Sequence, residues 1–460
     1  MSGSPTIQLG EVTTKVGSGS TPRGGEAAYK STGTPLIRSM NVHFDGFREN
    51  GLAHIDEEQA AALRNVEVRA RDVLLNITGA SIGRVTIAPP HMDGARVNQH
   101  VCIIRPDDRL EPSFLRWFLA SPHQQRLINS MESGATRQAL TKEKILAFEV
   151  PLPSLDGQRE IVAELEKQFS RLDEAVANLQ RVKANLKRYK ASVLKAAVEG
   201  RLVETEATLA HREGRTYESG DQLLQRVLEE RRGAWIGKGK YKEPEPPVLD
   251  GLNPLPDGWA YATAEQMCGQ IASGSTPSPE SMFSGAGDVP FLKVYNLTFD
   301  GSLDFTVKPT FVSNATHQGM LARSRSVPGD VLLNIVGPPL GKVSIVPTAY
   351  PEWNINQAIV TFRTSSGLVN QLLAYWLLAR PVLSRLERTA KATAGQHNLQ
   401  VSTCRKLPIP VPPLAEQTRI VAKVDRHLSI IREVEAEVDA NLQRAQALRQ
   451  ATLQRAFAIG

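Results

Sequence analysis

Two glycine-rich segments are the closest that this 460-residue sequence comes to a cofactor-binding motif. Residues 337–344 (GPPLGKVS) are similar to a phosphate-binding loop, but the spacing is one residue short and Val343 stands where a Ser or Thr would bind Mg²⁺. Residues 283–287 (FSGAG) have the spacing of an S-adenosylmethionine loop, yet no Asp/Asn-Pro-Pro-aromatic motif accompanies them. The sequence therefore predicts a turn at residues 337–344 and no cofactor held by this chain.

Metal ligands and catalytic groups are equally sparse. The nine histidines show no His-Glu-x-x-His spacing, and the three cysteines are far apart, which argues against a zinc site or a disulfide framework. Asp156 with Glu164 and Glu166 superficially resembles a nuclease carboxylate set, but these residues lie in a segment with helical periodicity. We therefore expect no metal site and no catalytic residue, and predict that the chain is not an enzyme by itself.

Amide, hydroxyl and basic side chains offer a different chemistry, which is recognition through hydrogen bonds. Asn and Gln can bond the edge of adenine, Arg can bond guanine, and other polar side chains suit phosphate oxygens. Residues of these types recur at matching positions in the two halves of the chain, and we predict that they bind DNA or support the scaffold that does. The two sets are Ser18, Ser20, Thr21, Arg38, Asn41, Asn76, Arg84, Asn98 and Gln99, and then Ser273, Ser275, Thr276, Lys293, Asn296, Asn334, Lys342, Asn356 and Gln357.

Shared residues cannot explain how two halves would read different sequences. Scaffold or phosphate-directed roles are therefore expected for most of them. The divergent stretches 47–71 and 302–328, with Arg137 and His397 nearby, are the better candidates for reading bases.

The segments that position these groups form a long internal repeat. SGSTP (18–22) and TPLIRSMNVHFDG (34–46) recur 255 residues later, the second as VPFLKVYNLTFDG. DVLLNITGASIGRVTIAP (72–89) recurs after 258 residues as DVLLNIVGPPLGKVSIVP, and residues 140–162 match 399–421 after 259. Because the offset drifts by only four residues, the chain consists of two homologous halves.

Each half is predicted to be a mixed α/β domain followed by a long helix. Short β-branched runs (VLLNI after Asp72, GRVTIA, and VCIIR at 101–105) indicate strands, and residues 111–128 and 367–386 indicate helical pieces. We expect the α/β (mixed) fold class, with two repeated recognition domains, a pseudo-two-fold internal repeat, and two long helices that form an antiparallel coiled coil. The predicted segments are domain 1 (1–157), helix 1 (158–205), a linker (206–257), domain 2 (258–416) and helix 2 (417–460).

Both long helices carry an apolar seam in alternating steps of four and three residues, which is typical of a coiled coil. About 36 residues per helix make a rod of roughly 54 Å, which could span one to one and a half turns of a duplex. The alternative is that each helix packs on its own domain. The predicted seam includes Leu165, Leu172, Leu179, Leu186, Val193, Val424, Ile431 and Val438.

Charge and composition are those of a soluble protein. The net charge is +6, residues 1–157 are neutral, and residues 181–195 carry six basic residues and no acidic one. That run fits a solvated helix face and a phosphate-facing one equally well. No apolar stretch is long enough to cross a membrane and the N-terminus lacks a signal peptide, so a cytoplasmic location is expected. The proline-rich end of the linker, residues 240–259, predicts an extended strap.

In combination, these motifs closely resemble the specificity subunit of type I restriction-modification systems. The resemblance rests on the doubled domain, the G-S-G-S-T-P opening, the D-V-L-L-N-I-x-G strand and turn, the Asn-Gln pair, and the P-L-P and P-P-L entries to the long helices. It covers nearly the whole chain, including NPLPDGW before the second domain. The C-terminal ending AFAIG departs from the AVEGRLVE that follows the first helix, which leaves the last turns of the second helix undefined.

The resemblance implies two target recognition domains that each read one half of a bipartite double-stranded DNA sequence. It also implies that the helices dock two methyltransferase subunits, which would supply S-adenosylmethionine and adenine N6 methylation, and that separate restriction subunits would use ATP with Mg²⁺ to cleave DNA. No membrane partner is expected. The alternatives are a self-sufficient methyltransferase or nuclease, and a purely structural coiled-coil scaffold. The sequence leaves open which bases are read, the length of the gap between them, and whether a restriction subunit accompanies the system.

Overall fold

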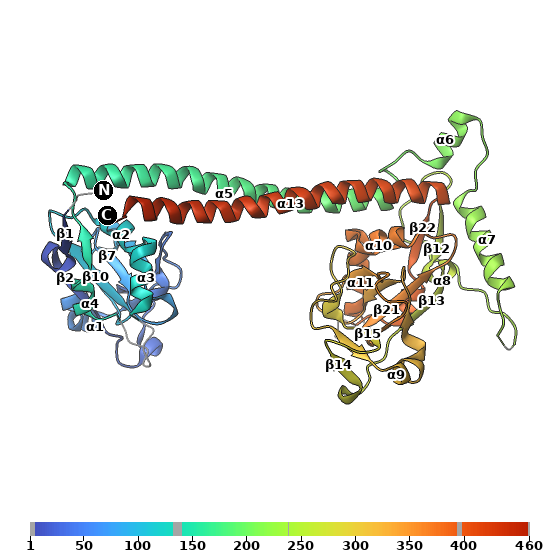
Figure 1. Ribbon diagram of the computed structural model, residues 1–460, viewed down its shortest axis with the longest axis horizontal. Coiled ribbons are helices and arrows are strands. Elements are labelled where there is room, and N and C mark those ends of the chain that lie inside the picture. Colours follow the sequence, from blue (N-terminus) through green and yellow to red (C-terminus); the bar gives the residue numbers. More distant parts are fainter. Residues whose placement is uncertain (1–4, 132–139, 238, 393–397, 459–460) are drawn as a thin grey trace. The chain divides into compact units, whose positions relative to one another are not determined.

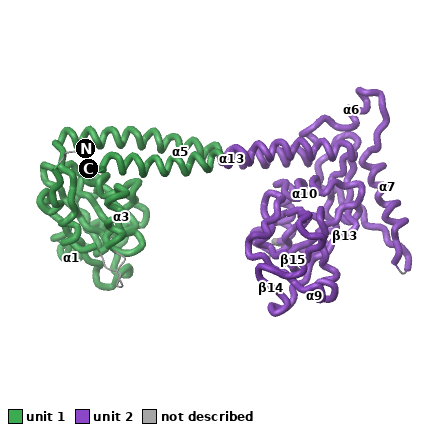
Figure 2. The backbone as a smooth tube through the Cα atoms, in the orientation of Figure 1, with its two compact units in different colours: residues 1–182, 437–460 green, residues 183–436 purple. Residues whose placement is uncertain are grey.

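The computed structural model describes residues 5–131, 140–237, 239–392 and 398–458. The chain divides into two compact units (Figure 2): unit 1 comprises residues 1–182 and 437–460, and unit 2 comprises residues 183–436. The division cuts across both long helices, α5 (Leu155–Val198) and α13 (Leu414–Ala456). Each unit therefore holds part of both helices, and the predicted five-segment division of the chain stays a prediction.

Unit 1 is built on an antiparallel sheet in the order β2-β10-β7-β8, with the smaller sheets β6-β3-β9, β1-β11 and β4-β5 (Figure 1). Helix α2 packs on β7 and β8 and lies between this sheet and the long helices. The elements of this unit before α5 are β1 (Thr6–Gln8), β2 (Thr13–Ser18), β3 (Thr34–Ile37), β4 (Val42–His43), β5 (Gly46–Phe47), β6 (Ala53–Ile55), α1 (Glu57–Ala62), β7 (Val73–Asn76), β8 (Val85–Ile87), β9 (Arg96–Val97), β10 (Val101–Pro106), α2 (Pro112–Leu119), α3 (Pro122–Ser130), α4 (Lys142–Leu146) and β11 (Glu149–Pro151).

Unit 2 repeats the sheet as β13-β21-β18-β19, with the pair β12-β22 and a five-stranded sheet β14-β16-β15-β20-β17. Helix α10 packs on β18 and β19 as α2 does in unit 1. Its elements before α13 are α6 (Glu206–Glu213), α7 (Gly220–Gly233), β12 (Ala260–Thr263), α8 (Ala264–Met267), β13 (Cys268–Ser273), β14 (Met282–Ser284), β15 (Val289–Leu292), β16 (Thr310–Val312), α9 (Asn314–Gln318), β17 (Arg325–Ser326), β18 (Val331–Asn334), β19 (Val343–Ile345), β20 (Trp353–Ile355), β21 (Ile359–Thr364), α10 (Asn370–Leu378), α11 (Arg380–Ala392), α12 (Val401–Arg405) and β22 (Pro408–Val411).

The mixed α/β class and the strands predicted after Asp72 and at 101–105 are confirmed. Each predicted helical piece, by contrast, is two helices. Pro122 is the first residue of α3 and Pro381 the second residue of α11, because a proline lacks the N–H that a helix interior requires. The linker also contains α6 and α7, which the sequence did not predict, whereas its described residues between Gly233 and Ala260 form no helix or strand.

The two long helices run antiparallel within each unit, as predicted. In unit 1, Asp173 of α5 pairs with Arg449 near the end of α13 at 2.6 Å. In unit 2, the hydroxyl oxygen of Tyr189 in α5 lies 3.0 Å from the Nδ1 atom of His427 in α13. Helix α5 ends where Gly200 takes a left-handed conformation and the N–H of Arg201 donates to the Ala196 carbonyl, which closes the last turn.

The seam residues differ in burial along the two helices. Leu165 of the seam joins the core of unit 1, together with its neighbours Val162 and Phe169, with Leu453 of α13, and with Phe457 just after that helix. The other buried seam residues are Val193, Val424 and Ile431 in unit 2 and Val438 in unit 1, while Leu172, Leu179 and Leu186 are half-buried. A pair of helices covers only one side of each seam side chain, so part of the stripe stays open.

Candidate nucleic-acid interface

In each unit the Ser-Gly-Ser-Thr-Pro loop crosses directly over the turn that carries the Asn-Gln pair. A Cβ atom on Gly19 would lie 1.8 Å from the carbonyl oxygen of Val97, and one on Gly274 would lie 1.9 Å from that of Ile355. No side chain fits at such distances, so glycine is required at both crossings. In unit 1 the crossing is closed by the Gly19 N–H, which donates to the Asn98 carbonyl at 3.1 Å.

The crossing brings together two polar side chains that are far apart in sequence. The hydroxyl of Thr21 donates to Oε1 of Gln99, and the hydroxyl of Thr276 donates to Oε1 of Gln357. Gln99 and Gln357 are both exposed. The two units therefore present the same threonine and glutamine pair at the surface. Beside the pair, Ser18 and Ser20 are exposed in unit 1, and Ser273 and Ser275 are partly exposed in unit 2.

Two of the shared asparagines, Asn41 and Asn296, are instead occupied within the fold. The Oδ1 atom of Asn41 accepts from the Arg38 N–H at 2.9 Å and its Nδ2 donates to the Arg48 carbonyl, and Asn296 makes the matching bonds with Lys293 and Asp304. Both side chains are buried. We therefore place Asn41 and Asn296 in the scaffold, and a direct DNA contact from them would require the turn to open.

A second pair of asparagines ends β7 and β18: Asn76 ties its strand to a segment far away in the sequence, whereas Asn334 closes the turn that follows it. The Nδ2 atom of Asn76 donates to the Ser39 carbonyl at 2.9 Å, and that of Asn334 donates to the Pro339 carbonyl at 2.9 Å. Both side chains are fully buried. Asn98 is also buried, and its Oδ1 accepts from the His100 N–H at 3.1 Å. Asn356 is partly exposed and has a buried Oδ1 with no hydrogen-bond partner in the described chain.

The basic residues of the two sets differ in their contacts within the fold. Arg38 donates to Glu26 at 2.9 Å and to the Gly51 carbonyl at 2.6 Å, and its guanidinium lies over the ring of Tyr29. The Nζ atom of Lys342 donates to the Val294 carbonyl at 3.1 Å. Lys293 and Arg84 are partly exposed. Arg137 and His397, the candidates for base reading, lie outside the described residues.

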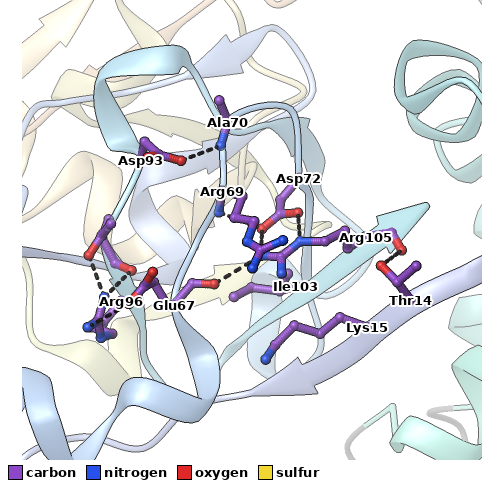
Figure 3. Close-up of polar contacts among 12 residues, drawn as sticks. Thr14, Lys15, Glu67, Arg69, Ala70, Asp72, Asp93, Arg96, Ile103 and Arg105 are labelled. Atoms are coloured by element: carbon purple, nitrogen blue, oxygen red, sulfur yellow. Dashed lines mark hydrogen bonds and ion pairs between the residues drawn. The ribbon is translucent and has the colours of Figure 1, made fainter. Parts of the chain in front are cut away.

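A buried ion pair fixes the strands that carry these turns (Figure 3). Arg105 of β10 donates to both carboxylate oxygens of Asp72, each at 2.7 Å, and Asp72 also accepts from the Arg69 N–H at 2.8 Å. The same guanidinium donates to the Glu67 carbonyl at 3.0 Å. The arrangement holds β7 against β10, from whose ends Asn76 and the Asn98-Gln99 turn emerge.

The sequence reasoning missed His100 and Thr78, which extend the hydrogen-bonded cluster in unit 1. The Nε2 atom of Gln99 lies 3.0 Å from Nε2 of His100, and the hydroxyl of Thr78 meets Nδ1 of the same ring. A signal was available in the repeat, where Val336 stands at the position of Thr78 and Ala358 at that of His100. The two halves therefore differ beside the threonine and glutamine pair that they share.

Thiol chemistry is not available in either unit. Burial raises the pKa of Cys102, Cys268 and Cys404 to about 12 in each case, so these thiols stay protonated near neutral pH. Among the described residues, no group of three or more His, Cys, Asp and Glu side chains is placed to hold a metal ion. The described helices also include none that combines the length and apolar character of a membrane span.

The chain is similar to specificity subunits of type I restriction enzymes. It is 24% identical over 399 residues to the type I restriction enzyme EcoBI specificity subunit of Escherichia coli, covering 85% of this chain and 73% of that protein. It is 19% identical over 445 residues to the EcoKI specificity subunit of Escherichia coli strain K12, covering 92% and 81%.

Two solved structures share the fold. One, from a study of complex assembly and conformational transition of the type I R-M system, has a TM-score of 0.66 at 20% identity and covers 99% of this chain and 97% of its own. The other is the HsdS subunit from Thermoanaerobacter tengcongensis, with a TM-score of 0.53 at 20% identity and coverage of 98% and 96%. The family described as type I restriction modification DNA specificity domain matches residues 1–187 and 256–443. The chain therefore belongs to the type I restriction-modification DNA specificity family.

Proposed function

We propose that this chain reads a bipartite double-stranded DNA target, one part with each unit, and carries no catalytic site of its own. The observation that supports this most directly is the threonine and glutamine pair on a glycine crossing, formed once in each unit. Amide and hydroxyl groups held at a surface suit hydrogen bonding to base edges and phosphates. Since each unit has its own cluster with different neighbours, each can read a different sequence.

We further propose that the long helices dock two methyltransferase subunits. Those subunits would bind S-adenosylmethionine and methylate adenine at N6, and restriction subunits with ATP and Mg²⁺ would add cleavage. The half-buried seam residues Leu172 and Leu179 in unit 1 support a partner surface, because their apolar side chains stay partly open along the helix. The relatives are named as specificity subunits of restriction enzymes. The whole assembly would act on DNA in the cytoplasm.

A domain exchange tests the reading role. Residues 1–150 are replaced by the corresponding segment of a family member with a different target, and methylated adenines are mapped across a genome that carries the hybrid. We expect one part of the recognised sequence to change and the other to stay as it was. A change in both parts, or in neither, contradicts the proposal.

Two further measurements separate the alternatives. The purified chain is incubated with S-adenosylmethionine and duplex DNA, and we expect no methyl transfer until methyltransferase subunits are added; transfer by the chain alone would favour the self-sufficient enzyme. Footprinting of the assembled complex on its mapped target should protect both parts. A complex that protects no sequence preferentially would favour a purely structural scaffold.

A further inference from the structure

A cavity of about 800 Å³ in unit 1 is lined by α2, by the turn between β4 and β5, and by the two long helices. Two buried aromatic side chains in its lining, Trp117 of α2 and Phe169 of α5, have ring centroids 4.9 Å apart. The guanidinium carbon of Arg116 lies 3.6 Å from the ring centroid of Trp117, and that of Arg449 on α13 lies 4.5 Å from the ring centroid of Phe169. The cavity therefore presents two cations stacked on two adjoining rings.

The charges of these two arginines are balanced differently. Arg449 pairs with Asp173 of α5 at 2.6 Å. Arg116 is half-buried and forms no ion pair with any residue that the structure describes. Its guanidinium donates to the carbonyl of Phe44, which is a neutral group. Arg116 therefore keeps a full positive charge that the protein does not neutralise directly.

The surroundings of Arg116 disfavour that charge. Burial lowers the pKa of Arg116 to about 10, and the charge of Arg449 acts in the same direction. Glu166 and Asp45 act in the opposite direction, but neither forms an ion pair with the guanidinium. A guanidinium that is partly withdrawn from water is stabilised by a carboxylate, which can accept two parallel hydrogen bonds from it. Arg116 is therefore suited to receive an acidic group from outside the chain.

The repeat indicates that the fold does not need this charge. Tyr375 stands 259 residues after Arg116 at the equivalent position, and Asp425 stands at that of Glu166. The hydroxyl of Tyr375 donates to the carboxylate of Asp425. Unit 2 thus fills the same position with a neutral side chain that has its partner within the chain. Because packing alone is met by a tyrosine, the arginine of unit 1 requires another explanation.

The rest of the lining indicates which acidic group fits. Three carboxylates, those of Asp45, Glu166 and Asp173, line the cavity together with the two guanidinium groups, so positive charge is not in excess. A chain of phosphates, such as a DNA backbone, would be repelled by the carboxylates. Phe44 is exposed and adds an apolar surface. A protein segment that carries one carboxylate beside apolar side chains matches this lining, and tryptophan and arginine are enriched where protein interfaces bind most strongly.

We infer that this cavity is a docking pocket for a segment of the methyltransferase subunit held at unit 1. Arg116 binds a carboxylate of that segment, and Phe44 packs against its apolar side chains. The inference rests on the proposed function, in which the long helices dock two such subunits. The subunit held at unit 2 lacks this contact, because Tyr375 replaces the arginine there.

Three variants of the full chain test the inference. R116A removes the charge, the double variant R116Y/E166D installs the residue pair of unit 2, and the control R126A removes an exposed arginine from α3. Each is titrated with the purified methyltransferase subunit, with calorimetry for the affinities and light scattering for the stoichiometry. We expect R116A to weaken one of two binding sites by about 30-fold, as for a central arginine of an interface, and to leave the other unchanged. R126A should bind like the unaltered chain.

The double variant separates the contact from the fold. R116Y/E166D should keep the thermal unfolding midpoint of the unaltered chain, since the same pair is accommodated in unit 2, but should weaken the same site as much as R116A does. The inference is overturned if both variants keep both affinities, or if they weaken the two sites equally. It is also overturned if R116A instead lowers the slope of log DNA affinity against log salt, which would make the ligand a DNA phosphate. An unaltered chain that binds no methyltransferase subunit would overturn the proposed docking itself.

Discussion

Arg105 donates two parallel hydrogen bonds to Asp72, each 2.7 Å long, and the same bidentate pair recurs 258 residues later between Arg363 and Asp330 at 2.9 and 2.8 Å. In both units the aspartate is buried and also accepts a backbone N–H, from Arg69 or Val327. Two sheets that differ in most of their residues thus share one buried anchor between their central strands.

Removing one partner of this anchor leaves a charge without compensation in the protein interior. The side chain of Asp72 is only 1% exposed, so R105A should lower the free energy of unfolding by about 3–5 kcal/mol. Chemical denaturation measures the loss. The matched control R48A breaks an exposed pair with Asp45 and should cost at most about 1 kcal/mol. Equal effects from the two variants would contradict the role given to Asp72.

The end of α13 belongs to the core of unit 1. Phe457 is buried, and its ring centroid lies 5.2 Å from that of Phe114 and 5.9 Å from that of Phe118 on α2. F457A should therefore lower the free energy of unfolding by about 3–5 kcal/mol, as expected for a buried phenylalanine. L448A, which changes an exposed side chain on α13, should stay within about 0.5 kcal/mol. Thermal or urea unfolding measures the loss. An F457A variant as stable as the unaltered chain would contradict this packing.

A buried glutamine anchors the start of each long helix. Gln158 accepts from the Glu111 N–H at 2.8 Å and donates to the carbonyls of Arg109 and Pro153, and Gln417 makes the corresponding three bonds in unit 2. Because Q158A leaves these backbone groups unsatisfied, we expect a loss of about 1–3 kcal/mol. Hydrogen exchange should speed up at the first turns of α5.

The exchange experiment has two built-in comparisons. Q158A should leave exchange at the start of α13 unchanged, and Q417A should show the reverse pattern. Q168A removes an exposed glutamine of α5 that bonds only to Glu164 among the described residues, and it should alter neither site. Uniform acceleration in all three variants would mean that the glutamines do not act locally.

Two buried glutamates, Glu416 near the start of α13 and Glu206 on α6, have pKa values that shift in opposite directions. Burial raises the pKa of Glu416, against hydrogen bonds from the Glu206 N–H and from Trp259. Burial also opposes ionisation of Glu206, but hydrogen bonds from Arg419 and Arg215 outweigh it and lower the pKa of Glu206. The folded state therefore favours the protonated form of Glu416 and the ionised form of Glu206.

The sign for Glu416 follows from linkage. A carboxyl whose pKa is higher in the folded state stabilises the fold below its ordinary value, about 4.3, and this contribution is lost as the pH rises through the raised value. The unfolding midpoint of the unaltered chain should therefore fall relative to that of E416Q as the pH rises. Glu206 is present in both proteins, so the stability that is lost when it is protonated in acid is common to both curves of unfolding midpoint against pH. A constant difference between them would exclude the shift.

Binding to DNA should depend steeply on salt, and Arg84 offers a way to assign part of that dependence. This residue is partly exposed at the end of the turn before β8. If it neutralises one phosphate, R84A should reduce the slope of log affinity against log salt by about 0.9, with the same loss on the specific target as on unrelated duplexes. Fluorescence anisotropy across a salt series measures both. A loss confined to the target would instead make Arg84 a base contact.

The internal repeat let the sequence predict much of the fold. Matching blocks gave the central strands β7 and β18, the long helices and their antiparallel pairing, because repeated periodicity survives where individual residues differ. The breaks at Pro122 and Pro381 were foreseeable from proline chemistry but were not predicted. The helices α6 and α7 carry no repeat and lie outside the matched blocks, which removed the main source of information.

The sequence by itself determined which polar residues the two halves share, but not which of them face solvent. Asn41 and Gln99 have similar chemistry and both recur, yet Asn41 is buried against backbone groups whereas Gln99 is exposed beside Thr21. Burial depends on which segments cross, and the contact of Thr21 with Gln99 joins residues 78 positions apart, beyond the reach of local pattern. The contacts of His100 likewise exist only because the fold sets its ring against the amide of Gln99 and the hydroxyl of Thr78.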